Sequence, residues 1–137
     1  MEGNGLNQLF HMFFQQNRYL VNKLNDVLKP HGIFSSKWTI LYLLHQNGPM
    51  SLTAIWKYLN VEAPTVTRTV NRLESLGWVE RLHALDKREK MIFLTNKGLE
   101  QFPPIEAAVQ SFEQEIENRL SQEDQELLMG ILKKIEG

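Results

Sequence analysis

Near the start of the chain the apolar residues recur at intervals of three and four, which is the spacing of one face of an α-helix. Pro30 and Gly32 follow this stripe and are expected to end the helix. The apolar positions are Leu6, Leu9, Phe10, Phe13, Leu20, Val21, Leu24, Val27 and Leu28. The pattern predicts a long amphipathic helix over residues 6–29.

Three shorter helices are predicted next. Ser35 or Ser36 is expected to cap the first of them, which ends at Gly48. Ser51 is expected to cap the second, and the third begins with Pro64 near its first turn. The inward faces of the three helices are formed by Trp38, Leu41, Leu44, Leu52, Ile55, Leu59, Val66, Val70 and Leu73.

The periodicity changes from helical to alternating after Gly77, which is placed to close a helix in the left-handed conformation. Residues 78–83 and 91–94 are predicted to be strands, with the polar segment 84–89 as the tip of a hairpin between them. A two-stranded hairpin is only marginally stable in isolation, so this one is expected to pack against the helices.

Two helical segments are predicted after the hairpin. Thr95 is expected to cap the first, and Pro103 and Pro104 to break or kink it, because each proline removes a backbone donor and clashes with the preceding turn. Ser121 and Asp124 have the spacing of a capping box for the last helix. The apolar stripe of that helix is Leu127, Leu128, Ile131, Leu132 and Ile135.

Composition agrees with one compact unit, residues 1–137, that is mainly α with a small β-hairpin. The chain is 42% hydrophobic and 23% charged, which suffices for one core and argues against disorder. It contains no cysteine, so a disulfide framework, a thiolate zinc site and a thiol redox switch are excluded. Neither a signal peptide nor an apolar run of about 20 residues is found, so a cytoplasmic protein without membrane contact is expected.

The net charge of −1 conceals an uneven distribution. Residues 1–50 carry a net charge of +2, residues 51–98 carry +3 and residues 99–137 carry −6. This polarity would orient the middle of the chain toward an anionic partner. A solvated acidic helix at the end of the chain would give the same count.

The third and fourth helices, joined by a short turn and followed at once by a hairpin, match a helix-turn-helix with a wing. Outside the inward stripe, the fourth helix carries side chains that can donate hydrogen bonds to base edges or phosphates. They are Thr65, Thr67, Arg68, Asn71 and Arg72. A plain solvated surface is the alternative interpretation of this face.

The hairpin tip carries three cations, Lys87, Arg88 and Lys90. Asp86 is placed to hold the Arg88 guanidinium in a fixed direction, which suits insertion into a narrow, electronegative minor groove. A salt-bridged, solubilising turn would explain such a tip on an arbitrary hairpin. Beside a candidate recognition helix, the DNA-binding interpretation is favoured.

Two stretches resemble the multiple-antibiotic-resistance-regulator (MarR) family. Residues 64–98, PTVTRTVNRLESLGWVERLHALDKREKMIFLTNKG, resemble its recognition helix, Val-Glu-Arg strand, Asp-x-Arg wing and Leu-Thr-x-Lys-Gly motif. Residues 120–135, LSQEDQELLMGILKKI, are similar to its closing helix. The resemblance implies a winged helix-turn-helix lobe over residues 35–94, and a homodimerisation stalk formed by residues 6–29 and 95–137.

The resemblance implies a homodimeric repressor that binds double-stranded DNA sequence-specifically, at a pseudo-palindrome with half-sites roughly 34 Å apart. Arg88, oriented by Asp86, would enter the minor groove, and Lys87 and Lys90 would contact phosphates. Between Arg81 and Asp86 the chain departs from the family by being short and by carrying Leu82 and Leu85. Reading of the major groove is assigned to Pro64, Thr65, Thr67, Arg68 and Asn71.

Many members of this family are released from DNA by a small aromatic or anionic effector bound between stalk and lobe. Five residues could line such a site: Arg18, Tyr19, Trp38, Tyr42 and His45. Ordinary core or interface roles for Trp38 and Tyr42 are the alternative.

No metal, cofactor or catalytic function is expected from the sequence. The four histidines, at positions 11, 31, 45 and 83, lack a second ligand at metal-binding spacing, and no nucleotide-binding or catalytic motif is present. The competing function is a winged-helix module for protein association. Such a module would favour apolar residues on its exposed face, whereas this face is basic and rich in hydroxyl groups.

Overall fold

The computed structural model describes residues 5–83 and 90–137. It is mostly helical with one small antiparallel sheet, which confirms the predicted fold class. The elements in chain order are α1 (Gly5–Leu28), a 3-10 turn (Lys29–His31), α2 (Ser35–Asn47), β1 (Met50–Ser51), α3 (Leu52–Leu59), α4 (Ala63–Ser75), β2 (Val79–His83), β3 (Lys90–Leu94), α5 (Asn96–Glu117) and α6 (Gln122–Ile135).

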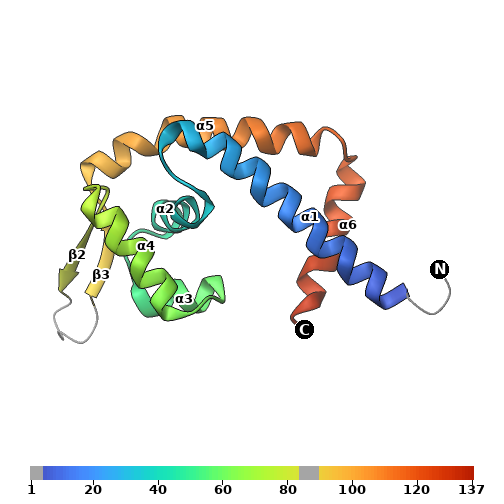
Figure 1. The fold of residues 1–137 in the computed structure, drawn as a ribbon, viewed down its shortest axis with the longest axis horizontal. Coiled ribbons are helices and arrows are strands. Elements are labelled where there is room, and N and C mark those ends of the chain that lie inside the picture. The colour runs from blue at the N-terminus through green and yellow to red at the C-terminus, as the bar shows by residue number, and fades with distance from the viewer. Residues whose placement is uncertain (1–4, 84–89) are drawn as a thin grey trace.

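A compact lobe and an extended pair of arms make up the molecule (Figure 1). Helices α2, α3 and α4 and the sheet form the lobe, which lies at the N-terminal end of α5. Helix α1 packs along α5, and its first half extends with α6 to the opposite end of the molecule, where both termini lie. The core consists of lobe residues together with Leu28, Phe102, Ile105 and Val109 of α1 and α5.

The sheet has three strands in the order β1-β3-β2, one more than the sequence pattern predicts. Val79 pairs with Leu94 and Leu82 with Met91 along the β2–β3 hairpin. The additional strand, β1, is only two residues long and pairs Met50 with Ile92. Two residues are too few to show an alternating pattern, so this strand could not be recognised from periodicity.

Three of the predicted helix caps are confirmed. Ser51 and Thr95 accept hydrogen bonds from the backbone N–H groups of Ala54 and Gly98, at 3.0 and 3.1 Å. Ser121 and Asp124 form the predicted reciprocal capping box at the start of α6. These caps act within four residues along the chain, which is why local sequence reveals them.

The start of α2 is not capped as the sequence predicts, by Ser35 or Ser36 at the N-cap position. Ser35 is the first residue of α2, and no side-chain cap comes from the N-cap residue Phe34. Instead the Ser35 N–H donates to the Asn25 Oδ1 of α1 at 2.7 Å. Helix α1 therefore satisfies a donor at the start of α2, ten residues further along the chain.

The sequence predicts a break or a kink at the proline pair. A break is wrong, because α5 is one helix with Pro103 and Pro104 inside it. The two missing N–H groups would have bonded the carbonyl groups of Leu99 and Glu100, four residues earlier. Both of these residues are exposed, so water can hydrate their carbonyl groups. The flanking Phe102 and Ile105 are buried, and their packing stabilises the helix on either side of the pair.

The close packing around Gly98 explains why the chain needs glycine at this position of its Leu-Thr-x-Lys-Gly motif. A Cβ atom at Gly98 would lie 2.2 Å from the backbone oxygen of Trp78, closer than atoms approach without displacement. Around this contact, the Thr95 N–H donates to the Trp78 oxygen at 3.1 Å and the Thr95 hydroxyl donates to the Gly77 oxygen at 2.5 Å. The start of α5 is thereby fastened directly to the junction between α4 and β2.

Replacing Gly98 with alanine is expected to lower the free energy of unfolding by about 1–3 kcal/mol, because the backbone of Trp78 or α5 must shift. Urea denaturation measures the change. Gly130→Ala is the matched control, since its Cβ would meet open space and helix propensity favours alanine by up to about 1 kcal/mol. Equal stability of Gly98→Ala and the unmodified protein would contradict the steric interpretation.

Candidate nucleic-acid interface

Helix α4 is held in one orientation by its apolar stripe. Val66, Val70 and Leu73 are buried in the core between the other lobe helices and the sheet. Asn60 ends α3 in the left-handed conformation, with φ of 56°, and this sharp turn directs the chain into α4. A rotation of α4 would expose its apolar stripe, so the opposite face must point outward.

The outward face carries five of the six DNA-contacting residues that the sequence predicts on this helix. The side chains of this set are exposed on α4: Pro64, Thr65, Arg68, Asn71 and Arg72. Thr67 differs because it is half-buried and its hydroxyl donates to the Ala63 oxygen at 3.0 Å. The Arg68 Nη2 lies 3.4 Å from the Thr65 hydroxyl, so these two groups are neighbours on the exposed surface.

Arg81 of β2 reaches α4, a contact to which the sequence pattern assigned no role. Its Nη2 donates to the Asn71 Oδ1, and its Nε lies 3.6 Å from the Glu74 Oε2. The Nε is buried and has no hydrogen-bond partner among the described residues, so the Glu74 carboxylate is its nearest counter-charge. Ten residues separate Arg81 from Asn71, and no local pattern reveals which helix residue a strand side chain will meet.

The wing is described only at its base. Lys90 is exposed at the start of β3 and pairs with His83 of β2. Asp86, Lys87 and Arg88 lie outside the described residues, so their roles remain predictions. Leu82 of β2 is exposed, which places an apolar side chain on the wing strand.

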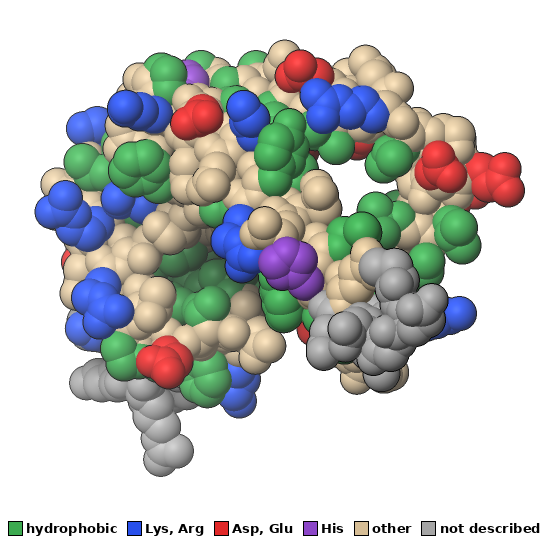
Figure 2. Space-filling view, turned by 45° about the vertical axis from the view of Figure 1, so that its right-hand side comes forward, with side chains coloured by type: hydrophobic (Ala, Val, Ile, Leu, Met, Phe, Trp, Pro, Cys, Tyr) green, Lys and Arg blue, Asp and Glu red, His purple; other side chains and the backbone are tan. Residues whose placement is uncertain are grey.

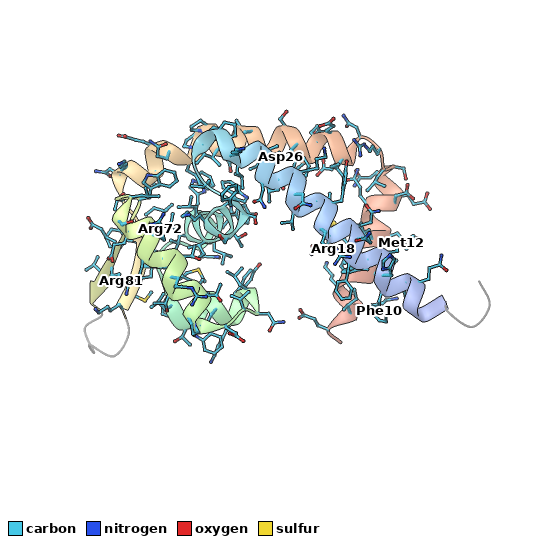
Figure 3. All side chains as sticks on the ribbon, in the orientation of Figure 1. Phe10, Met12, Arg18, Asp26, Arg72 and Arg81 are labelled. Atoms are coloured by element: carbon cyan, nitrogen blue, oxygen red, sulfur yellow. The ribbon has the colours of Figure 1, made fainter. Side chains whose placement is uncertain are left out.

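Basic side chains prevail on the visible face of the lobe. In Figure 2, Lys and Arg side chains outnumber Asp and Glu side chains over the lobe, at the left of the view. Figure 3 locates Arg72 and Arg81 on this lobe, whereas Phe10, Met12 and Arg18 lie on α1, away from the lobe. The positive charge of residues 51–98 is thus concentrated on the part that carries α4.

Two of the five predicted effector residues line a common pocket. Trp38 and Tyr42 of α2 face α5 across a cavity of about 410 Å³. Glu106 and Glu113 of α5 also line the cavity. Partial burial, followed by the nearby charge of Glu117, raises the pKa of Glu113 above its usual value.

The other three predicted effector residues do not line this pocket. His45 stacks on Phe102, with ring centres 3.9 Å apart and an interplanar angle of 8°. Arg18 donates to the Gln15 Oε1 at 3.0 Å on exposed α1. A side-chain hydrogen bond to Tyr19 raises the pKa of the Arg119 guanidinium above its usual value, which places Tyr19 beside the end of α5. The single chain therefore supplies an aromatic wall, but not the predicted cation.

Among residues 5–83 and 90–137, no group of three or more potential metal ligands lies together. Within the same residues, no helix is both long and apolar enough to cross a membrane.

The buried stripe of α4, its outward polar face and the adjoining hairpin define a winged helix-turn-helix protein. The sequence model of the MarR family matches residues 34–90. The uncharacterized HTH-type transcriptional regulator YwoH of Bacillus subtilis strain 168 is 45% identical over 118 residues, which are 86% of each chain. The chain belongs to the MarR family of transcriptional regulators.

Solved structures of regulators have the same fold. A Cys-to-Ser mutant of MarR from E. coli complexed with operator DNA matches with a TM-score of 0.88 and 27% identity, covering 98% of both chains. Wild-type MarR from E. coli in its apo form matches with a TM-score of 0.74 and 30% identity, covering 95% of both chains. AbfR of Staphylococcus epidermidis matches with a TM-score of 0.83 and 26% identity, over 96% of this chain and 90% of AbfR.

Proposed function

We propose that this regulator is a homodimeric repressor that binds a pseudo-palindromic operator with α4 in the major groove and the wing at the minor groove. The observation that carries the proposal is the outward face of α4, where Thr65, Arg68 and Asn71 are exposed opposite the buried stripe. Hydroxyl, guanidinium and amide groups are the ones that read base edges. An interface for a protein partner would instead favour exposed apolar anchors.

The structural comparison supports DNA as the partner. The chain is more similar to the operator-bound E. coli mutant than to apo wild-type MarR from E. coli, with TM-scores of 0.88 and 0.74. The described arrangement of lobe and arms is therefore close to one in which a related protein contacts its operator. Under this proposal Lys90 and Lys87 contact phosphates, and Arg88 held by Asp86 enters the minor groove.

The uncovered apolar surface of the arms supports a homodimer. Helix α6 is amphipathic, yet none of its residues is buried in the single chain. Large apolar side chains are exposed on the first half of α1 as well: Leu9, Phe10, Met12, Phe13 and Phe14. Apolar surface of this extent is covered in soluble proteins, and a second copy related by a two-fold axis would cover both arms at once.

The pocket between α2 and α5 supports release by a small ligand. Its aromatic wall of Trp38 and Tyr42 suits a planar compound. Because Glu106 and Glu113 also line it, its charge favours an aromatic cation over an anion. Binding there would act on the junction between the lobe and α5, and so on the spacing of the two lobes of a dimer.

Selection from random duplexes should enrich a two-fold symmetric site with half-sites about one helical turn apart. Affinity for it should fall steeply with salt. Lys90→Ala should reduce the slope of log affinity against log salt by about two, because each subunit of the homodimer loses one phosphate contact. Lys133→Ala, which removes the same charge from α6, is the control and should leave the slope unchanged. If no sequence is enriched, the lobe is a protein-association module instead.

Leu128→Glu should dissociate the dimer, because it places a charge within the proposed apolar interface. Sedimentation equilibrium should then give the mass of one chain, whereas the unmodified protein gives twice that mass. Lys133→Glu is the control, since this residue is exposed on α6 outside the apolar stripe. A monomeric unmodified protein at micromolar concentration would contradict the proposed homodimer.

Benzamidine should bind to the pocket between α2 and α5 at least several-fold more tightly than benzoate does. The benzamidine cation would be attracted both by the aromatic rings and by the two carboxylates of the lining. Quenching of tryptophan fluorescence measures both affinities. Replacing Glu106 and Glu113 together with glutamine should abolish the preference, while Glu100→Gln, an exposed position on the same helix, should preserve it. Tighter binding of benzoate to the unmodified protein would refute the cationic ligand class.

A further inference from the structure

The contact between Arg81 and Asn71 fixes the orientation of an amide group on the outward face of α4. A guanidinium group has five N–H donors and no acceptor. An amide that faces it must therefore present its oxygen, as the Asn71 Oδ1 does in accepting from the Arg81 Nη2. The Asn71 NH2 group consequently points away from Arg81, and it donates to no group among residues 5–83 and 90–137.

Arg81 is itself held in place. Its side chain is only 20% exposed, and its Nε faces the Glu74 carboxylate at 3.6 Å. Asn71 and Glu74 lie three residues apart on α4, so one guanidinium group spans a turn of the helix from the neighbouring strand. Few rotamers can satisfy both contacts, so the Asn71 amide is prevented from flipping.

From this geometry we infer that Arg81 is a positioning residue that sets which base Asn71 selects. The inference rests on the proposed function, in which α4 reads the major groove. An asparagine that recognises adenine uses its oxygen and its NH2 group together, to accept from N6 and donate to N7. Here Arg81 engages the oxygen, whereas the NH2 group offers two donors. Guanine presents two neighbouring acceptors, O6 and N7, and is the base that fits.

The test is a set of binding titrations with the selected operator and duplexes that differ from it at one base pair. Asn71→Ala first identifies the pair that Asn71 reads, as the position whose base preference disappears in this variant. At that pair the unmodified protein should bind guanine about tenfold or more better than adenine. Arg81→Met frees the amide to flip and should bring the two affinities within about twofold.

Two control variants distinguish an effect of Arg81 on the orientation of the Asn71 amide from a general effect on the stability of the fold. Glu74→Gln removes the counter-charge but retains the Arg81–Asn71 hydrogen bond, so the guanine preference should persist. Asn71→Asp presents only acceptors to the base, and should shift the preference toward cytosine, whose N4 group donates. This second variant tests base selection even if Arg81→Met fails to fold.

Each remaining outcome is decisive. If Arg81→Met weakens binding to all duplexes equally and the guanine preference survives, Arg81 only supports the fold and the inference is wrong. A preference for adenine in the unmodified protein would also overturn it. Failure of the proposed function would differ from both, because no duplex would then be bound selectively by any variant.

Discussion

The burial of one stripe of α4 is the constraint on which the proposed DNA-binding surface depends. Val66, Val70 and Leu73 recur at intervals of four and three residues, and all three lie within the core of the lobe. Burying side chains of this size stabilises the fold by roughly 1.5–3 kcal/mol each, so α4 has one favourable rotation about its axis. The polar residues between them are consequently presented to solvent as a defined set of donors, on a rigid element.

The lobe and the arms differ in how completely they cover their own apolar surface. The lobe encloses a continuous core that extends to Phe102 and Val109 of α5. Thr95 fastens the start of α5 to the junction between α4 and β2, where Gly98 permits the close approach. By contrast, α6 and the first half of α1 leave large apolar side chains exposed in the single chain. In the proposed homodimer, a second copy would cover the apolar surface of the arms, and the tight junction between arm and lobe would keep the two lobes at a set distance.

Features encoded within a few residues were predictable from the sequence. The caps at Ser51, Thr95 and Ser121, the hairpin and the two faces of α4 all follow from local spacing and were confirmed. The family resemblance extended this to the architecture of the whole chain, because its motifs occur in order along the sequence.

Contacts between distant segments were not predictable. The Asn25 side chain bonds the start of α2 and the Arg81 side chain meets Asn71, in each case ten residues away. Helix α5 also continues through Pro103, because tertiary burial on either side outweighs the local penalty. Likewise the cation predicted for the effector pocket is absent from its lining, since Arg18 extends along α1 and away from the lobe.

The proposed division of roles assigns sequence discrimination to Thr65, Arg68 and Asn71 of α4, and attraction that is independent of sequence to the lysines. It is tested most directly by the ratio of affinities for the selected operator and a scrambled duplex. In the unmodified protein this ratio should be about 10³ or more. Thr65→Val combined with Asn71→Ala leaves the net charge unaltered, and should lower the ratio by roughly tenfold or more while affinity for the scrambled duplex stays constant. An equal loss of affinity for both duplexes would contradict the claim.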